Sequence, residues 1–182
     1  QITIGDMLTH LLVLLLVQAT AQGPTKGTLP GATNVTRVDA TIACGGATTT
    51  EAFPELKKQG FTSIINLRRE SEPGADIPGA KAAAVTAGLK YIHIPVDGAN
   101  PSSEDADAFL KAVTNRENHP AYIHCASANR VGAMWLIKRV VVDGWEIERA
   151  TAEAEAIGLT NPGLKKFAVD YATKHKGQPR GE

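Results

Sequence analysis

A helix that must lie in the middle of the fold constrains this chain more than any other feature. Residues 131–142 have the length of a helix and are apolar on nearly every side, and Gly144 follows as a stop signal. A helix that is hydrophobic all round is packed among several neighbours. The sequence therefore predicts a domain built around this one helix.

The regions around this helix alternate between strand and helix patterns over residues 37–175. The expected strands cover 41–43, 61–67, 91–96 and 121–124, and the other expected helices cover 48–59, 79–87, 103–115, 147–156 and 162–174. This alternation is typical of an α/β domain in which helices flank a central, mostly parallel sheet. With 182 residues, the chain is long enough for one ordinary domain and too short for two.

The first 36 residues have a different character. The unbroken apolar run Leu11–Val17 follows Met7 and precedes Ala19-Thr20-Ala21, the small-x-small pattern of a signal-peptidase site. We expect residues 1–21 to hold a signal peptide with upstream residues, and the domain to be periplasmic or secreted. A buried N-terminal helix and an uncleaved anchor are the alternatives.

The flanking segments and the membrane question follow from length and composition. The apolar run is too short to cross a bilayer as a helix, and no later segment is long and apolar enough to do so. Residues 22–36 are rich in Gly, Pro and Thr and are predicted to be a linker. Residues 176–182 are predicted to be a flexible tail.

Charge and cysteine content exclude several function classes. The formal net charge is zero and 43% of the residues are hydrophobic, so no basic excess points to a nucleic-acid partner. Two cysteines, Cys44 and Cys125, make neither a disulfide framework nor a four-ligand zinc site, and the five histidines show no metal-ligand spacing. We therefore expect no metal and no cofactor.

The turn between the strand at 121–124 and the central helix carries the chemistry. Cys125 ends the strand, Ala126, Ser127, Ala128 and Asn129 are small or short, and Arg130 enters the helix. In such a turn, backbone N–H groups form a nest for an anion, and the helix dipole adds positive potential. Arg130 can place two N–H groups on two oxygens of a tetrahedral anion.

This positive field favours the thiolate of Cys125, a strong nucleophile toward a bound phosphorus or sulfur atom. His124 is expected to order the loop by hydrogen bonds rather than to transfer protons. The alternative is that Cys125 is a buried apolar residue without chemistry.

Three segments resemble a known family. TIACGGATTTEAFPELKKQGFTSIINLR, YIHIPVDG and AYIHCASANRVGAMW are similar to the bacterial dual-specificity-type phosphatase domains of beta-lactamase-hydrolase-like proteins and of proteins fused to NAD kinases. The resemblance covers about residues 38–175. It implies a phosphotyrosine-phosphatase-like, three-layer fold.

The resemblance also implies roles for individual residues. Cys125 would form a cysteinyl-phosphate, the N–H groups of residues 126–130 would hold the phosphate, and Arg130 would clamp it. Asp97 would protonate the leaving oxygen and then activate water. The substrate would be a phosphorylated protein or a small-molecule phosphate ester.

Some of these roles have simpler alternatives. Asp97 precedes a glycine and is equally explained as a turn residue. Glu104 and Asp105 are fallback acids, although the first turn of a helix attracts acids anyway. Arg68 ends a predicted strand, where it could touch the substrate or form a structural ion pair.

Three departures from the family pattern keep other functions open. Four residues separate Cys125 from Arg130 where five are usual, Val131 replaces a hydroxyl residue, and Ala128 stands where relatives often have Gly. If position 128 needs a positive φ, alanine is strained there. The short loop is similar to that of rhodanese-like sulfurtransferases, whose cysteine carries a persulfide. A sulfurtransferase and a catalytically silent anion-binding module are therefore the alternatives to a phosphatase.

The second cysteine also has two interpretations. Cys44 lies at the end of a predicted strand, where it is explained as a small packing residue. Some phosphatases of this class pair the nucleophile with a second cysteine, so a redox lock between Cys44 and Cys125 is the alternative. The choice depends on the Cα separation of the two residues.

Overall fold

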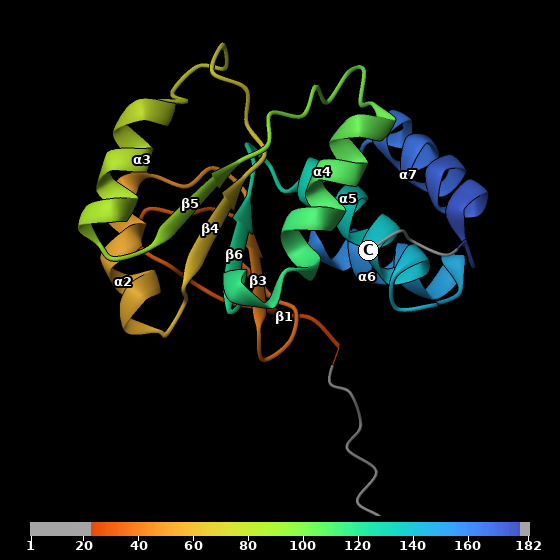
Figure 1. Cartoon of the computed structure of the whole chain (residues 1–182), viewed down its shortest axis with the longest axis horizontal. Helices are drawn as coiled ribbons and strands as arrows, with labels where there is room; N and C mark the ends of the chain where they lie inside the picture. The colour runs from red at the N-terminus through yellow and green to blue at the C-terminus, as the bar shows by residue number, and fades with distance from the viewer. Residues whose placement is uncertain (1–22, 179–182) are drawn as a thin grey trace, which may run out of the picture.

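The computed structural model describes residues 23–178 and shows one six-stranded sheet between two layers of helices (Figure 1). The strand order is β1-β2-β3-β6-β4-β5. The strands are β1 (Thr25–Lys26), β2 (Thr36–Arg37), β3 (Ile42–Gly45), β4 (Ser63–Asn66), β5 (Lys90–His93) and β6 (Ala121–His124). The helices are α2 (Phe53–Lys58), α3 (Ile77–Thr86), α4 (Ser103–Thr114), α5 (Asn129–Val141), α6 (Ile147–Ile157) and α7 (Pro162–His175), with short 3-10 turns η1 (Thr50–Ala52) and η2 (Arg116–Asn118).

The predicted α/β architecture is confirmed, and so is the central helix. Strands β3, β6, β4 and β5 are mutually parallel. Helices α2 and α3 lie on one face of the sheet, and α4, α5, α6 and α7 lie on the other (Figure 1). Helix α5 packs against α4, α6 and α7, and each of its residues from Arg130 to Ile137 is buried.

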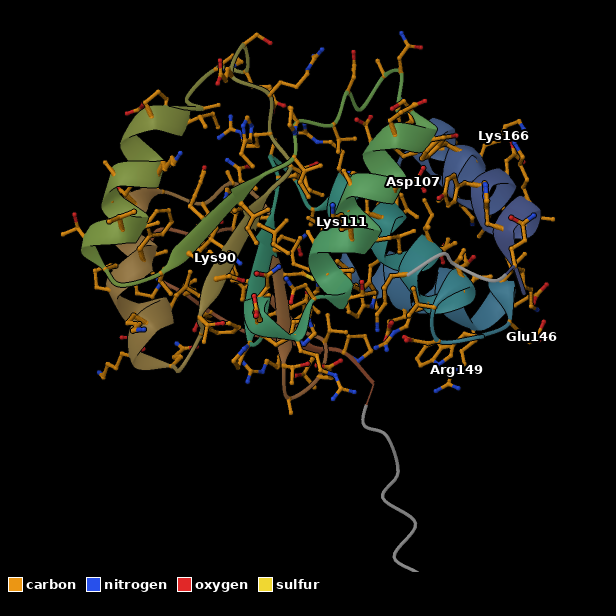
Figure 2. The ribbon with its side chains drawn as sticks, in the orientation of Figure 1. Lys90, Asp107, Lys111, Glu146, Arg149 and Lys166 are labelled. Atoms are coloured by element: carbon orange, nitrogen blue, oxygen red, sulfur yellow. The ribbon has the colours of Figure 1, made fainter. Side chains whose placement is uncertain are left out.

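The four helices on that face are tied together by polar contacts as well as by apolar packing. Trp135 of α5 donates its indole N–H to Glu153 of α6 at 2.7 Å. The hydroxyl of Tyr171 in α7 donates to Asp107 of α4, which points toward α7 in Figure 2. These contacts hold the helix that begins at the cysteine loop in a fixed position.

The N-terminal segment departs from the prediction. Residues 25–36 were expected to be part of a linker, and that prediction is wrong, because β1 and β2 pair antiparallel with each other and β2 pairs with β3. Leu29, between the two strands, is buried in the core on the α2 and α3 face. Two-residue strands are too short to leave a hydrophobic alternation in the sequence.

Several other expectations concern the ends of the chain. The predicted signal peptide lies outside the described residues, and export stays a prediction. Helix α7 ends at His175, and most of the predicted tail also lies beyond the described part. Between residues 23 and 178, no helix combines the length and hydropathy that crossing a bilayer requires.

The parallel strands bring the chemistry-bearing loops to one edge of the sheet. Gly45, His124, Asn66 and His93 are register partners across β3, β6, β4 and β5, and each is the last residue of its strand. The loops after β4 and β5 therefore rise beside the point where β6 leads into α5 (Figure 1). Ligands of open α/β sheets bind at this edge.

Candidate active site

Cys125 follows β6 directly and begins the loop that enters α5. Its side chain is fully buried in the core on the α5 face, and its main-chain N–H lies 3.4 Å from the carbonyl oxygen of Gly45. The thiol therefore lies at the carboxyl edge of the sheet, next to the N-terminus of a helix of 13 residues.

The loop after Cys125 offers a set of unused donors. None of the main-chain N–H groups of residues 126–131 donates to an acceptor within the described part of the chain. The carbonyl of Ala128 already accepts from Gly132, so the helix is formed immediately behind these groups. Consecutive unused N–H groups at a helix N-terminus are the chemistry of an oxyanion site.

Ala128 is the N-cap of α5 and has a left-handed conformation, with φ 74° and ψ −2°. The expected strain at this position is therefore present, because a left-handed conformation is costly for a residue with a Cβ. Ala128 is fully buried and Ser127 is exposed. The loop thus keeps its shape against the local preference of its own residue 128.

Arg130 is placed differently from the simple forked clamp that we expected. Its Nη1 donates to Glu72 Oε1 at 2.5 Å and to the carbonyls of Val96 at 3.0 Å and Leu67 at 3.1 Å. Its Nη2 donates to Glu72 Oε2 at 2.8 Å. No oxygen among the described residues accepts from its Nε–H or its second Nη2–H, and the sulfur of Cys125 is a further hydrogen-bond partner of the guanidinium.

The surroundings of Arg130 raise the pKa of its guanidinium and so keep the side chain charged beside the thiol. Burial lowers the pKa of its guanidinium, but the hydrogen bonds to Glu72 and the nearby sulfur of Cys125 act more strongly and raise it. Arg130 is therefore a permanent cation beside Cys125.

Glu72 is the functional residue that the sequence did not reveal. Burial raises the pKa of its carboxyl, but hydrogen bonds from Arg130, from the main chain of Arg69 and from Arg68 outweigh burial and lower the pKa to about 2. A single carboxylate thus orients the loop arginine from outside the loop. The sequence around Glu72 is polar and contains proline, and this composition indicates only a surface loop.

Arg68 takes the structural alternative. Its Nε donates to Glu72 at 3.3 Å, and its terminal nitrogens donate to the carbonyls of Pro73 and Gly74. The side chain is buried and fixes the loop that carries Glu72. It supports Arg130 through Glu72 and also lines the cavity beside His124.

Asp97 lies beside the site but is turned toward another partner. Its Oδ1 accepts from the N–H of Ala99 and its Oδ2 accepts from Arg69 Nη1, both at 2.9 Å. The bond from Ala99 and the charge of Arg69 lower the pKa of this carboxyl. The next residue, Gly98, lies against Arg130, because a Cβ on it would be 3.7 Å from Arg130 Cδ.

The fallback acids have ordinary roles at the start of α4. Asp105 accepts from the N–H of Ser102 while the hydroxyl of Ser102 accepts from the N–H of Asp105, which makes a capping box. Glu104 is exposed in the first turn of the same helix. The charge of Arg130 is among the causes that lower the pKa of Asp97.

The ring of His124 is buried beside the main chain of Cys125 and Gly46, and its role in ordering the loop stays a prediction. Both ring nitrogens are buried without a hydrogen-bond partner among the described residues, and the ring stacks on Tyr122 with centroids 6.0 Å apart. Burial lowers the pKa of His124 to about 4, although the nearby main chain of Cys125 and Gly46 acts in the other direction. The ring lines a cavity of about 430 Å³ that Arg68 and Asp76 also line.

Asn129 fixes the loop to the far end of the domain. Its Oδ1 accepts from the main-chain N–H groups of Thr160 and Asn161, each at 2.7 Å. Its Nδ2 lies 3.3 Å from the hydroxyl of Ser127. The side chain of Asn129 is thus a structural clamp, while Ala126 and Ser127 remain exposed at the mouth of the loop.

Cys44 is a second buried free thiol, but its position argues against a redox lock. Burial raises the pKa of the Cys44 thiol, and Cys44 pairs in register with Ile123, two residues before Cys125. That offset places the two cysteine Cα atoms about 8 Å apart from strand spacing and rise alone. A disulfide between them would need backbone movement, so the packing interpretation of Cys44 holds.

A thiol followed by a donor-lined loop and an arginine, at the carboxyl edge of a parallel sheet, is an arrangement suited to holding a tetrahedral oxyanion beside a nucleophile. The profile of the family "DSP-PTPase phosphatase fused to NAD+ Kinase" matches residues 28–169. The chain belongs to this family. The expectation from the three sequence segments is thereby confirmed.

Curated relatives and solved structures agree with this assignment. The beta-lactamase hydrolase-like proteins of Xylella fastidiosa and Agrobacterium fabrum are each 34% identical over 121 residues, which is 64% of this chain. This match covers only about a quarter of their length, 26% and 27% respectively.

Three solved structures share the fold. A protein described as a DUF442 phosphatase from Shewanella putrefaciens CN-32 has a TM-score of 0.68 at 22% identity and covers 80% of this chain and 92% of its own. The core catalytic domain of the PP-IP phosphatase SIW14 from S. cerevisiae has a TM-score of 0.65 at 20% identity, and the match covers 79% of this chain and 88% of that domain. TpbA of P. aeruginosa has a TM-score of 0.63 at 17% identity, and the match covers 82% of this chain and 88% of TpbA.

Proposed function

We propose that this domain hydrolyses a phosphomonoester through a cysteinyl-phosphate on Cys125. The observation that carries the proposal is the set of unused main-chain donors beside the thiol, namely the N–H groups of residues 126–131, with the guanidinium of Arg130 next to the sulfur. Fixed donors that are not consumed by the protein stabilise charge as it develops on a transferring phosphoryl group.

The reaction has two displacement steps. In the first, the thiolate of Cys125 attacks phosphorus, the bond between phosphorus and the ester oxygen breaks, and Asp97 gives its proton to the leaving oxygen. In the second, Asp97 takes a proton from water, the resulting hydroxide attacks phosphorus, and the sulfur–phosphorus bond breaks to return the thiolate.

Asp97 must first leave Arg69 to act as the acid. In the present arrangement its carboxyl is held ionised by Ala99 and Arg69. Rotation of Asp97 toward the thiol would exchange these partners for the leaving group. The charge of Arg130, which contributes to the lowered pKa of Asp97, supports this role.

The second step is expected to be slow. Val131 follows the loop arginine and has no hydroxyl that could help the thiolate to leave. The phosphorylated cysteine should therefore accumulate, and product release in the first turnover should appear as a burst.

The substrate is proposed at the level of chemical class only. A phosphorylated protein or a small-molecule phosphate ester fits the site, and the mutant TpbA structure was determined with phosphotyrosine, which concerns that protein. A periplasmic or secreted location fits the apolar N-terminal run and is likewise a proposal.

The test is an assay of the purified chain with p-nitrophenyl phosphate and, separately, with thiosulfate and cyanide. We expect phosphate release that disappears in Cys125→Ser, persists in Cys44→Ser, and leaves a phosphorylated Cys125 detectable by mass in Asp97→Asn. Sulfur transfer with a persulfide on Cys125 would replace the proposal by the sulfurtransferase alternative. If the wild-type chain turns over neither donor, the anion-binding module is the alternative that remains.

A further inference from the structure

Asn34, in the turn between β1 and β2, touches the cysteine loop from outside. Its Nδ2 donates to the carbonyl oxygen of Ser127 at 3.2 Å. Its Oδ1 accepts from Lys26 Nζ at 2.7 Å, and Lys26 also donates to Thr36 and to the carbonyl of Ile157. Because an ammonium group can only donate, Lys26 determines which end of the Asn34 amide faces Ser127.

This contact fixes the direction of one peptide group. A trans peptide is planar, so its carbonyl and its N–H point in opposite directions. Asn34 holds the carbonyl of Ser127 on the side of the β1–β2 turn. The N–H of Ala128 belongs to the same peptide and therefore points away from that turn, where it stays without an acceptor among the described residues.

The peptide has a competing orientation that the sequence favours. The φ of 74° and ψ of −2° at Ala128 are those of the second central residue of a type II turn, and Ser127 before it has no positive φ. Rotating the peptide between Ser127 and Ala128 by half a turn gives a type I turn, in which residue 128 has a negative φ. For alanine the left-handed form is disfavoured by roughly tenfold.

The rotated form would remove the anion site. The carbonyl of Ser127 would then point where the N–H of Ala128 now points, so an acceptor would replace a donor. Gly158 packs closely on the outside of this peptide, since a Cβ on it would be 2.6 Å from Asn34 Nδ2 and 3.0 Å from Ala128 Cβ. Its lack of a side chain leaves Asn34 as the side chain that reaches the carbonyl of Ser127 from this side.

We propose that Asn34 is a positioning residue for the phosphate loop, which holds the Ser127–Ala128 peptide in its donor orientation against the preference of Ala128. The inference rests on the proposed function, because an oriented donor matters only to a bound oxyanion. The segment between β1 and β2 thereby contributes a residue that orients a donor of the site.

Two substitutions remove the donor and leave the turn intact. Asn34→Gly keeps the positive φ of 48°, and Asn34→Asp keeps the side-chain shape and the bond to Lys26. In both variants we expect roughly tenfold weaker binding of inorganic phosphate and a similar loss of kcat/KM. The amide resonance of Ala128, which shifts with phosphate in the wild-type chain, should shift much less.

The matched control is Thr33→Ala, which removes a hydroxyl bonded to the carbonyl of Ala47 in the same turn. It should bind phosphate like the wild type. The decisive variant is Ala128→Gly, because glycine has no penalty for a positive φ. In the Ala128→Gly background, Asn34→Gly should cost only about twofold to threefold in phosphate binding.

The outcomes separate this inference from the proposed function. Equal phosphate affinity and an unchanged Ala128 amide shift in both Asn34 variants would overturn it, and so would an equal loss in the Ala128→Gly background. Melting temperatures exclude a loss through unfolding. If the wild-type chain hydrolyses no ester, the phosphate titration still decides the role of Asn34.

Discussion

Glu72 and Arg130 form a two-point ion pair in which each carboxylate oxygen accepts from a different terminal nitrogen, at 2.5 and 2.8 Å. This pairing turns both terminal nitrogens of the guanidinium toward Glu72. The direction in which Arg130 presents its donors is thus set by a residue 58 positions earlier in the chain.

Removing the charge of Glu72 should loosen the arginine. In Glu72→Gln, one acceptor is lost and an amide N–H₂ faces the guanidinium, so we expect phosphate affinity and kcat/KM to fall roughly tenfold. The free energy of unfolding should fall by about 3 kcal/mol, because a mostly buried cation loses its partner. Titration calorimetry and urea unfolding measure the two effects, and Glu70→Gln on the exposed part of the same loop is the control. Unchanged phosphate binding would refute the role of Glu72.

The pH dependence of turnover tests Asp97 and its partner Arg69. The acid must be protonated in the first step, and its pKa is lowered, so activity should decline as the pH rises through this low pKa. In Arg69→Met the declining limb of kcat should move to higher pH, and in Asp97→Asn it should vanish. The measurement is the pH profile with an aryl phosphate. A limb that survives in Asp97→Asn belongs to another group.

His124 should make the fold sensitive to mild acid. Its pKa is about 4 in the folded chain against an ordinary value of 6.5, so between these values the unfolded state binds more protons. Stability should therefore fall as the pH drops from 6.5 to 4, by about 3 kcal/mol from this residue, and its contribution should level off below 4. The free energy of unfolding, measured in urea at several pH values across this range, should change less with pH in His124→Asn than in His119→Asn. Equal slopes would contradict the burial of a neutral ring.

Cys44 should be inert while the protein is folded. The side chain is fully buried and its pKa is raised by burial, so the thiolate that reacts with disulfide reagents is scarce. In Cys125→Ser, Ellman's reagent should label Cys44 only after unfolding in urea. Mild oxidation of the wild-type chain should give no bond between Cys44 and Cys125, as peptide mapping would show. A mapped bond between them would mean that β3 and the loop move.

The parts of the fold that could be predicted are those with a long or regular pattern. Helix α5 is apolar over residues 131–137, and the alternation of strand and helix patterns around it predicted a parallel sheet whose strand ends lie together. Strands β1 and β2 could not be found, because two residues in a Gly- and Thr-rich stretch carry no periodicity, and their pairing is decided by β3. Tertiary contacts, not local preference, form these strands.

The site was predictable where neighbours in sequence are neighbours in space. Cys125, the small loop and Arg130 form one turn, so their spacing could be interpreted directly. The strain at Ala128 was expected from the resemblance, because relatives often have glycine at that position. Glu72 and Asn34 act across 58 and 93 positions respectively, and no local pattern marks them.

The two outer contacts of the loop have a consequence for the order of synthesis. Asn34 near the start of the domain holds Ser127, and Asn129 holds Thr160 and Asn161 near its end. As the chain leaves the ribosome, the nucleophile and its arginine emerge about thirty residues before this second anchor does. The pocket for the anion is thus among the last parts of the domain to be completed, and a chain cut short before residue 160 carries the cysteine without a finished place to use it.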